Sequence, residues 1–172
     1  EIETRYLPDD KISNIKRWLI DTSIELDLSE KTHLSAQYYR VSDAKYFEEV
    51  ARTNTDVKTL KSTLELNYDN PSTNLEAAIL TEDEQVVNAG TPVYTRALEG
   101  SISKIFNADN KMPIQVDVVS TKFAHDTPGK ESGVRTHANL GVTRILSSKF
   151  PIITTRANVS STYYRLDNSS NI

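Results

Sequence analysis

The C-terminal part of the sequence alternates between two kinds of side chain over a long run. In "VTRILSSKFPIITTRANVSSTYYRLD", residues 142–167, one set of alternate positions holds Ile153, Thr155, Ala157, Val159, Ser161 and Tyr163, and the other holds Thr154, Arg156, Asn158, Ser160, Thr162 and Tyr164. Successive side chains of a β-strand point to opposite faces of the sheet, so this period of two predicts a strand. One face of it is mildly apolar and the other is polar.

The same alternation recurs along most of the chain. All six prolines lie between or at the edges of the alternating runs, where the missing N–H removes no hydrogen bond from a sheet. The pattern predicts about nine strands, over Glu1–Leu7, Arg17–Leu28, Thr32–Val41, Thr59–Asp69, Asn74–Glu82, Tyr94–Phe106, Met112–His125, Val134–Leu146 and Pro151–Asp167.

The segments between these strands alternate in length. Short connections read "SEK", "NPST", "NADNK" and "SSKF", whereas long ones read "PDDKISNIK", "SDAKYFEEVARTNTDVK", "DEQVVNAGTPV" and "DTPGKESG". Short turns on one side and long loops on the other are typical of outer-membrane β-barrels, whose strands need roughly 9–11 residues to cross the bilayer. The predicted fold class is therefore all-β, with antiparallel up-and-down strands, and these connections favour an outer-membrane β-barrel.

The aromatic residues favour the same interpretation. With the long loops outside the cell, one group falls toward the outer strand ends and another toward the periplasmic ends, which resembles the two aromatic girdles of such barrels. The outer group is Trp18, Tyr38, Tyr94, Phe123 and Tyr163, and the inner group is Tyr68, Phe106 and Phe150.

Two other folds fit part of the pattern. A soluble antiparallel sandwich also alternates and has polar turns. A soluble periplasmic ligand-binding sensor domain of mixed α/β type would place a helix over Asp43–Leu66 behind an N-cap at Ser42, because Val57, Leu60 and Leu64 keep helical spacing. The Thr and Asn residues at positions 53–55 argue against a continuous helix there.

Composition narrows the function classes. The net charge of −4, from 20 basic and 24 acidic residues, predicts no nucleic-acid partner, and a mean hydropathy of −0.49 leaves no room for a membrane-spanning helix. The chain has no cysteine, and His33, His125 and His137 lack the spacing of metal ligands. We expect no catalytic, metal or cofactor site. Because the chain starts at Glu1 and its only methionine is Met112, we expect it to begin inside a longer or processed protein.

Several segments resemble a known family. In "YYRVSDAKYFEEV", residues 38–50, a strand ends in Val-Ser-Asp and is followed by a Tyr-Phe pair and acidic residues. "EIETRYLPDDK" precedes it as a strand that ends in a Tyr-Leu-Pro-x-Asp-Lys loop, and a long hairpin pair that starts at "MPIQVDVV" follows it. In this order the segments resemble the barrel domain of the lipopolysaccharide (LPS) assembly protein family LptD, and the chain is similar to a middle slice of that barrel. The resemblance implies that the nine strands form part of a large outer-membrane β-barrel, and that residues 1–172 are a partial barrel domain, a fragment of a longer chain.

This resemblance implies transport of LPS into the outer leaflet of the outer membrane, without bond chemistry. It implies LPS, outer-membrane lipid, the plug lipoprotein LptE and, through an N-terminal domain absent from this chain, the periplasmic bridge protein LptA as partners. A different outer-membrane barrel, such as a porin, stays open as an alternative. The side chains expected to face the lumen, for contact with LPS or the plug lipoprotein, are Asp21, Glu25, Gln37, Lys61, Glu65, Glu76, Glu99, Gln115, Asp117, Arg135, His137, Asn139, Arg156 and Asn158.

Overall fold

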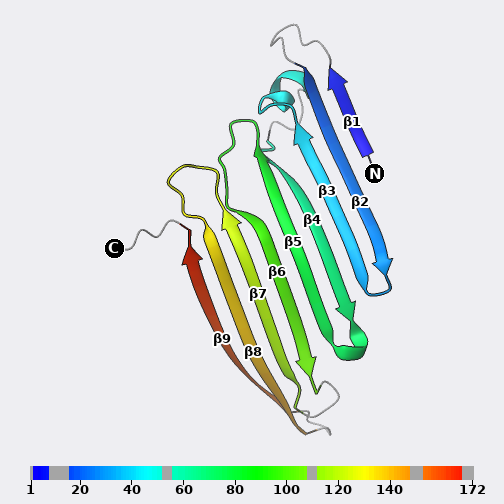
Figure 1. Ribbon diagram of the computed structural model, residues 1–172, viewed down its shortest axis with the longest axis vertical. Coiled ribbons are helices and arrows are strands. Elements are labelled where there is room, and N and C mark those ends of the chain that lie inside the picture. Colours follow the sequence, from blue (N-terminus) through cyan, green and yellow to red (C-terminus); the bar gives the residue numbers. More distant parts are fainter. Residues whose placement is uncertain (1, 8–15, 52–55, 108–111, 148–152, 168–172) are drawn as a thin grey trace.

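The computed structural model describes residues 2–7, 16–51, 56–107, 112–147 and 153–167 (Figure 1). These residues form one nine-stranded sheet in which every strand is antiparallel to the next along the chain. The predicted all-β, up-and-down fold class is confirmed. The strands are β1 (Ile2–Leu7), β2 (Arg17–Ser29), β3 (Thr32–Val41), β4 (Thr59–Asn70), β5 (Leu75–Val86), β6 (Thr95–Phe106), β7 (Ile114–Ala124), β8 (Gly133–Ser147) and β9 (Ile153–Leu166).

Most predicted boundaries are within two residues of the observed ones. β5 is the exception, because it continues to Val86, four residues beyond the predicted end. The alternative helix over Asp43–Leu66 is wrong: β4 begins at Thr59, and the helix of the described residues before it is a short π-helix, Phe47–Ala51. β4 is a strand because its whole length pairs with β5, from Thr59↔Val86 to Asn70↔Leu75. No helix among the described residues is long and apolar enough to span a bilayer.

The long and the short connections lie at opposite ends of the strands. The connections after β1, β3, β5 and β7 lie at one end of the strands, which we call the long-connection end (Figure 1). The connections after β2, β4, β6 and β8 lie at the opposite end, which we call the short-connection end. The β4–β5 turn is a 3₁₀ helix, Pro71–Thr73, that ends at Asn74 in the left-handed conformation with φ 50°. Asparagine tolerates this conformation better than most residues with a Cβ atom.

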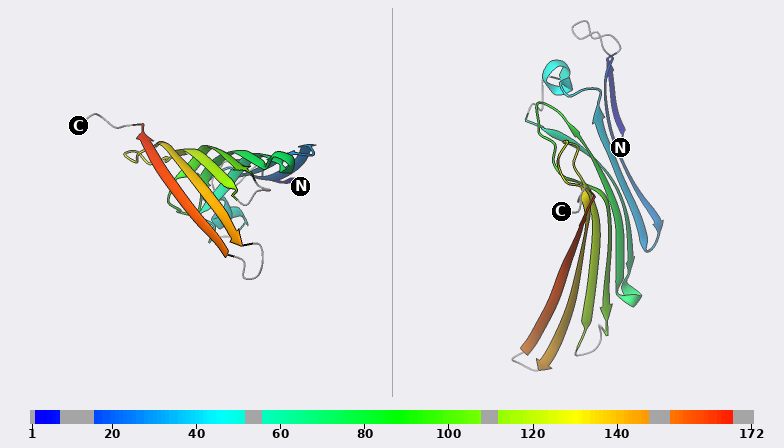
Figure 2. Two further views of the ribbon diagram at one scale, coloured as in Figure 1. Left: turned by 90° about the horizontal axis from the view of Figure 1, so that it is seen from below. Right: turned by 60° about the vertical axis from the view of Figure 1, so that its left-hand side comes forward.

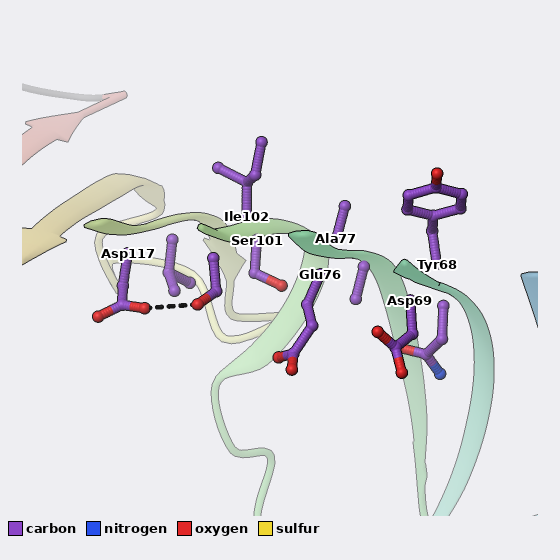
Figure 3. A pocket seen from close by; sticks show the side chains of 11 residues that line it. Tyr68, Asp69, Glu76, Ala77, Ser101, Ile102 and Asp117 are labelled. Atoms are coloured by element: carbon purple, nitrogen blue, oxygen red, sulfur yellow. Dashed lines mark hydrogen bonds between the residues drawn. The ribbon is translucent and has the colours of Figure 1, made fainter. Parts of the chain in front are cut away.

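The sheet is a single twisted and curved layer (Figure 2). Directly paired residues of neighbouring strands share a face, so the register assigns each strand residue to one of two faces. Figure 3 shows the division: Tyr68, Ala77 and Ile102 point to one side, and Glu76 and Asp117 point to the other. We call these the apolar face and the polar face. Large apolar side chains between 46% and 71% exposed cross the apolar face, namely Ile24, Leu26, Leu64, Ile79, Leu98, Ile102, Leu140 and Val159.

Backbone pairing is incomplete at the long-connection end. The β3–β4 ladder extends only from Thr32↔Tyr68 to Gln37↔Thr63, and the β5–β6 ladder stops at Leu80↔Glu99. We call these two unpaired regions, between β3 and β4 and between β5 and β6, the seams; side chains bridge both of them. At the first, the Gln85 amide accepts a hydrogen bond from the Val41 backbone N–H (2.9 Å) and donates one to the Val41 carbonyl (2.8 Å). The glutamine thus replaces a missing strand neighbour for that residue.

Close packing among the described residues is confined to one cluster at the long-connection end. Its buried members are Leu19, Val41, Tyr46, Phe47, Leu60 and Val87. The rings of Tyr46 and Phe47 meet edge to face, with centroids 5.6 Å apart, and burial raises the pKa of the Tyr46 hydroxyl. A backbone hydrogen bond also joins the β3–β4 connection to the β5–β6 connection: the Asn88 N–H donates to the Ala44 carbonyl oxygen at 2.8 Å.

Candidate functional site: the polar face of the sheet

All fourteen side chains expected in the lumen lie on the polar face. The register requires this, because each occupies a polar-face position of its strand and paired positions share a face. The polar face is also hollowed. One hollow of about 370 Å³ lies over β4–β7 and is lined by Asp69, Glu76, Ser101 and Asp117 among others (Figure 3). Another is formed by Glu3, Asp21, Ser23 and Gln37.

Four of the predicted residues meet in one hydrogen-bond network across β6–β9. The Asp117 carboxylate accepts hydrogen bonds from Ser103 Oγ (2.7 Å), Gln115 Nε2 (3.0 Å) and Asn139 Nδ2 (3.0 Å). Arg156 then donates to Gln115 Oε1 at 3.2 Å, which extends the network to β9. One carboxylate therefore fixes three neighbouring polar side chains, which favours a set, preorganised surface over freely moving side chains.

A second network crosses the β5–β6 seam. The Glu82 carboxylate lies 2.6 Å from Lys61 Nζ and also contacts the Arg96 guanidinium. Arg96 Nη1 lies 2.9 Å from Glu99 Oε1, and the Thr121 hydroxyl donates a hydrogen bond to Glu99 Oε2 at 2.7 Å. Glu82 is only 8% exposed, so its charge depends on these two cations. The network joins β4 to β7 where the β5–β6 backbone ladder has ended.

Within the described part of the chain, the remaining predicted residues make no hydrogen bond to either network. Glu65 accepts a hydrogen bond from Asn67 at 3.0 Å, and His137 shares one with Thr162 at 2.8 Å. Glu25, Glu76 and Asn158 also lie on the polar face. Glu76 pairs in register with Ser103, and Asn158 pairs with Gly141, the register partner of Gln115, so both lie beside the first network. Asn158 approaches Gly141 so closely that a Cβ atom there would lie 2.8 Å from its Oδ1. No group of His, Asp or Glu side chains suited to a metal ion occurs in the described ranges.

Sequence reasoning missed Glu82 and Arg96, the centre of the second network. Glu82 was detectable, because it is in phase with Glu76 on the same strand. Arg96 was not, because the β6–β7 register shifts between Arg96 and Leu98. This bulge inserts Ala97, so Arg96 and Glu99 share a face although they are three positions apart. Strict alternation would have placed them on opposite faces.

The aromatic residues divide between the two faces. Trp18, Tyr38 and Tyr163 lie on the apolar face toward the long-connection end, and Tyr68 and Phe106 lie on the same face toward the other end. Phe123 lies on the polar face instead, where it contacts Tyr94. Phe150 is outside the described residues. The apolar face thus carries aromatic side chains near both ends, with aliphatic ones between them.

Comparison with known families gives a match over most of the chain. The family model LptD, described as LPS transport system D, matches residues 16–171. The chain belongs to the LptD family. The resemblance inferred from residues 38–50 and their neighbours is confirmed, with the chain as a slice of the barrel region. Membership assigns LPS transport and assembly to this chain in general terms, within an outer-membrane transport family that is not an enzyme family. Comparison with curated proteins gave no match.

Proposed function

We propose that this sheet is a section of the wall of the LPS-translocating β-barrel in the outer membrane. The apolar face contacts lipid, and the polar face lines a hydrated lumen. One observation carries the proposal: a row of large apolar side chains crosses β2–β9 at 46–71% exposure, and no other described element covers it. A soluble domain rarely leaves so extended an apolar surface in water. The opposite face holds the fourteen polar residues and their networks.

In this arrangement the sugars and phosphates of LPS pass along the polar face and its acyl chains stay on the lipid side, on the way to the outer leaflet. The plug lipoprotein LptE contacts part of the same polar face. The bridge protein LptA binds a part of the protein outside residues 1–172, which form a partial barrel domain. Family membership supports LPS as the cargo, and the hollows and fixed polar side chains support a surface suited to sugars and phosphates.

Photocrosslinking at two adjacent residues of β9 tests the transport role. Ser160 lies on the polar face and Val159 on the apolar face, where it is 71% exposed. In the full-length protein in growing cells, a photoreactive phenylalanine analogue at position 160 is expected to form LPS adducts. They should disappear when LPS synthesis is blocked briefly, because cargo then leaves the lumen. Lipid adducts at position 159 should persist. An absence of LPS adducts at position 160 would contradict the proposal.

The orientation follows from connection length, because outer-membrane barrels keep their short turns in the periplasm. We expect Ser29–Lys31, Pro71–Thr73, Ala108–Asn110 and Ser147–Lys149 on the periplasmic side. A cysteine at Lys130, in the β7–β8 connection, should react with an impermeant maleimide on intact cells, whereas a cysteine at Ser72 should react only after the outer membrane is permeabilised. The reverse labelling pattern would invert the orientation.

A further inference from the structure

One hollow on the polar face differs from the others in its lining. It lies near the long-connection end, over β6–β9, has a volume of about 310 Å³, and is bordered by Tyr94, Phe123, Tyr164, Arg96 and Arg135. We call it the aromatic hollow. The hollow over β4–β7 is bordered by three carboxylates, whereas the aromatic hollow is bordered by three aromatic rings and two arginines. The two surfaces therefore suit different groups of one ligand.

Two rings of the aromatic hollow contact each other, and both of its tyrosine rings are open to solvent. Tyr94 meets Phe123 edge to face, with centroids 5.9 Å apart and an angle of 72°, and meets His125 at 4.7 Å. Edge-to-face contacts of this kind fix a ring without covering both of its faces. Tyr94 is 51% exposed and Tyr164 is 57% exposed. Ring faces are thus available on both sides of the hollow for a ligand to stack against.

The two arginines differ in what they contact. Arg96 is neutralised by Glu82 and Glu99. Arg135 pairs in register with Tyr164 and is exposed, and within the described ranges its guanidinium has no carboxylate or hydrogen-bond partner. A guanidinium offers two parallel N–H groups that fit the oxygens of a phosphate. The aromatic hollow therefore combines an available cation with flat apolar surfaces.

We propose that the aromatic hollow binds a phosphorylated sugar of the LPS headgroup during transit. The C–H face of a pyranose ring stacks on Tyr94 or Tyr164, and Arg135 binds the phosphate. This inference rests on the proposed function, because it names the part of the cargo that one section of the lumen recognises. An inorganic phosphate would use the arginine but not the rings, and an acyl chain would use the rings but not the arginine.

The test uses purified full-length protein and a deacylated, phosphorylated LPS oligosaccharide, which lacks the acyl chains that would bind the apolar face. A photoreactive phenylalanine analogue replaces Tyr164 or, as a matched control, Tyr163, the adjacent tyrosine on the opposite face. We expect adducts at position 164 and none at position 163. Arg135→Gln should lower adduct yield at position 164 about tenfold, the loss expected for one charge-assisted contact.

Two controls identify the phosphate and the arginine. Removing the phosphates from the oligosaccharide should reduce the yield as much as Arg135→Gln does, and should have no further effect in that variant. Arg144→Gln, on the same strand but the apolar face, should leave the yield unchanged. Equal adducts at positions 163 and 164, an unchanged yield in Arg135→Gln, or full displacement by equimolar inorganic phosphate would overturn the proposal. LPS adducts in cells at position 160 but not at 164 would reject this subsite alone, whereas none at either position would reject the transport role itself.

Discussion

Val118→Arg is expected to destabilise the assembled protein by about 2–4 kcal/mol, the cost of an arginine on the lipid face of a barrel near the bilayer midplane. Val118 is near the middle of β7, where its neighbours on the apolar face are Ile102 of β6 and Ala138 of β8. A guanidinium placed among these side chains would face hydrocarbon without a carboxylate partner. The measurement is the free energy of unfolding in lipid vesicles by denaturant titration, together with the amount assembled in cells.

The adjacent residue provides the matched control. Val119 has the same side chain and nearly the same depth, but it lies on the polar face between Ser101 and His137, beside the hollow that contains Asp117. Val119→Arg should cost less than about 1 kcal/mol, because the charge stays in water near carboxylates. Comparable losses in both variants would show that the apolar face is not in contact with lipid. A larger loss in Val119→Arg would reverse the assignment of the two faces.

The faces could be predicted because they depend only on alternation. A strand residue and its direct partner share a face, so a pattern recognised separately in each strand extends across the sheet once the order is up-and-down. For this reason the hairpin of β8 and β9 matches its sequence pattern: Leu140 pairs with Val159, and Gly141 pairs with Asn158 on the other face. Val159 is 71% exposed, as expected for a strand without a second layer over it.

Departures from the ladder could not be predicted in this way. The bulge at Ala97 depends on the β6–β7 register, and the seams beside β4 and β5 depend on where two ladders stop. Each is a non-local property that local hydrophobicity does not encode. The same holds for Gln85, whose amide binds the Val41 backbone although the two residues are 44 positions apart in the sequence. Alternation finds polar-face residues, but it does not show which of them bond to one another.

The second large effect is expected at the packed cluster of the long-connection end. Phe47→Ala should weaken the docking of the β3–β4 connection by about 3–5 kcal/mol, the usual cost of removing a buried phenylalanine. Phe47 is 1% exposed and packs with Tyr46, Leu19 and Val87, which come from three separate segments. Its loss would leave a cavity at the seam where β3 and β4 are not paired by backbone hydrogen bonds. Tryptic cleavage after Lys45 or Lys58 should therefore accelerate roughly a hundredfold or more.

Phe106→Ala provides the control for this effect. Phe106 is the last residue of β6. It is 47% exposed on the apolar face, at the short-connection end, whereas the cluster lies at the long-connection end. Its truncation should leave cleavage after Lys45 and Lys58 unchanged. If Phe47→Ala also leaves it unchanged, the connection is held by polar contacts, among them the hydrogen bond from Asn88 to Ala44 and the 2.5 Å ion pair between Arg17 and Glu49. Faster cleavage in Phe47→Ala alone would show that side-chain packing in the cluster stabilises the region where β3 and β4 lack backbone hydrogen bonds.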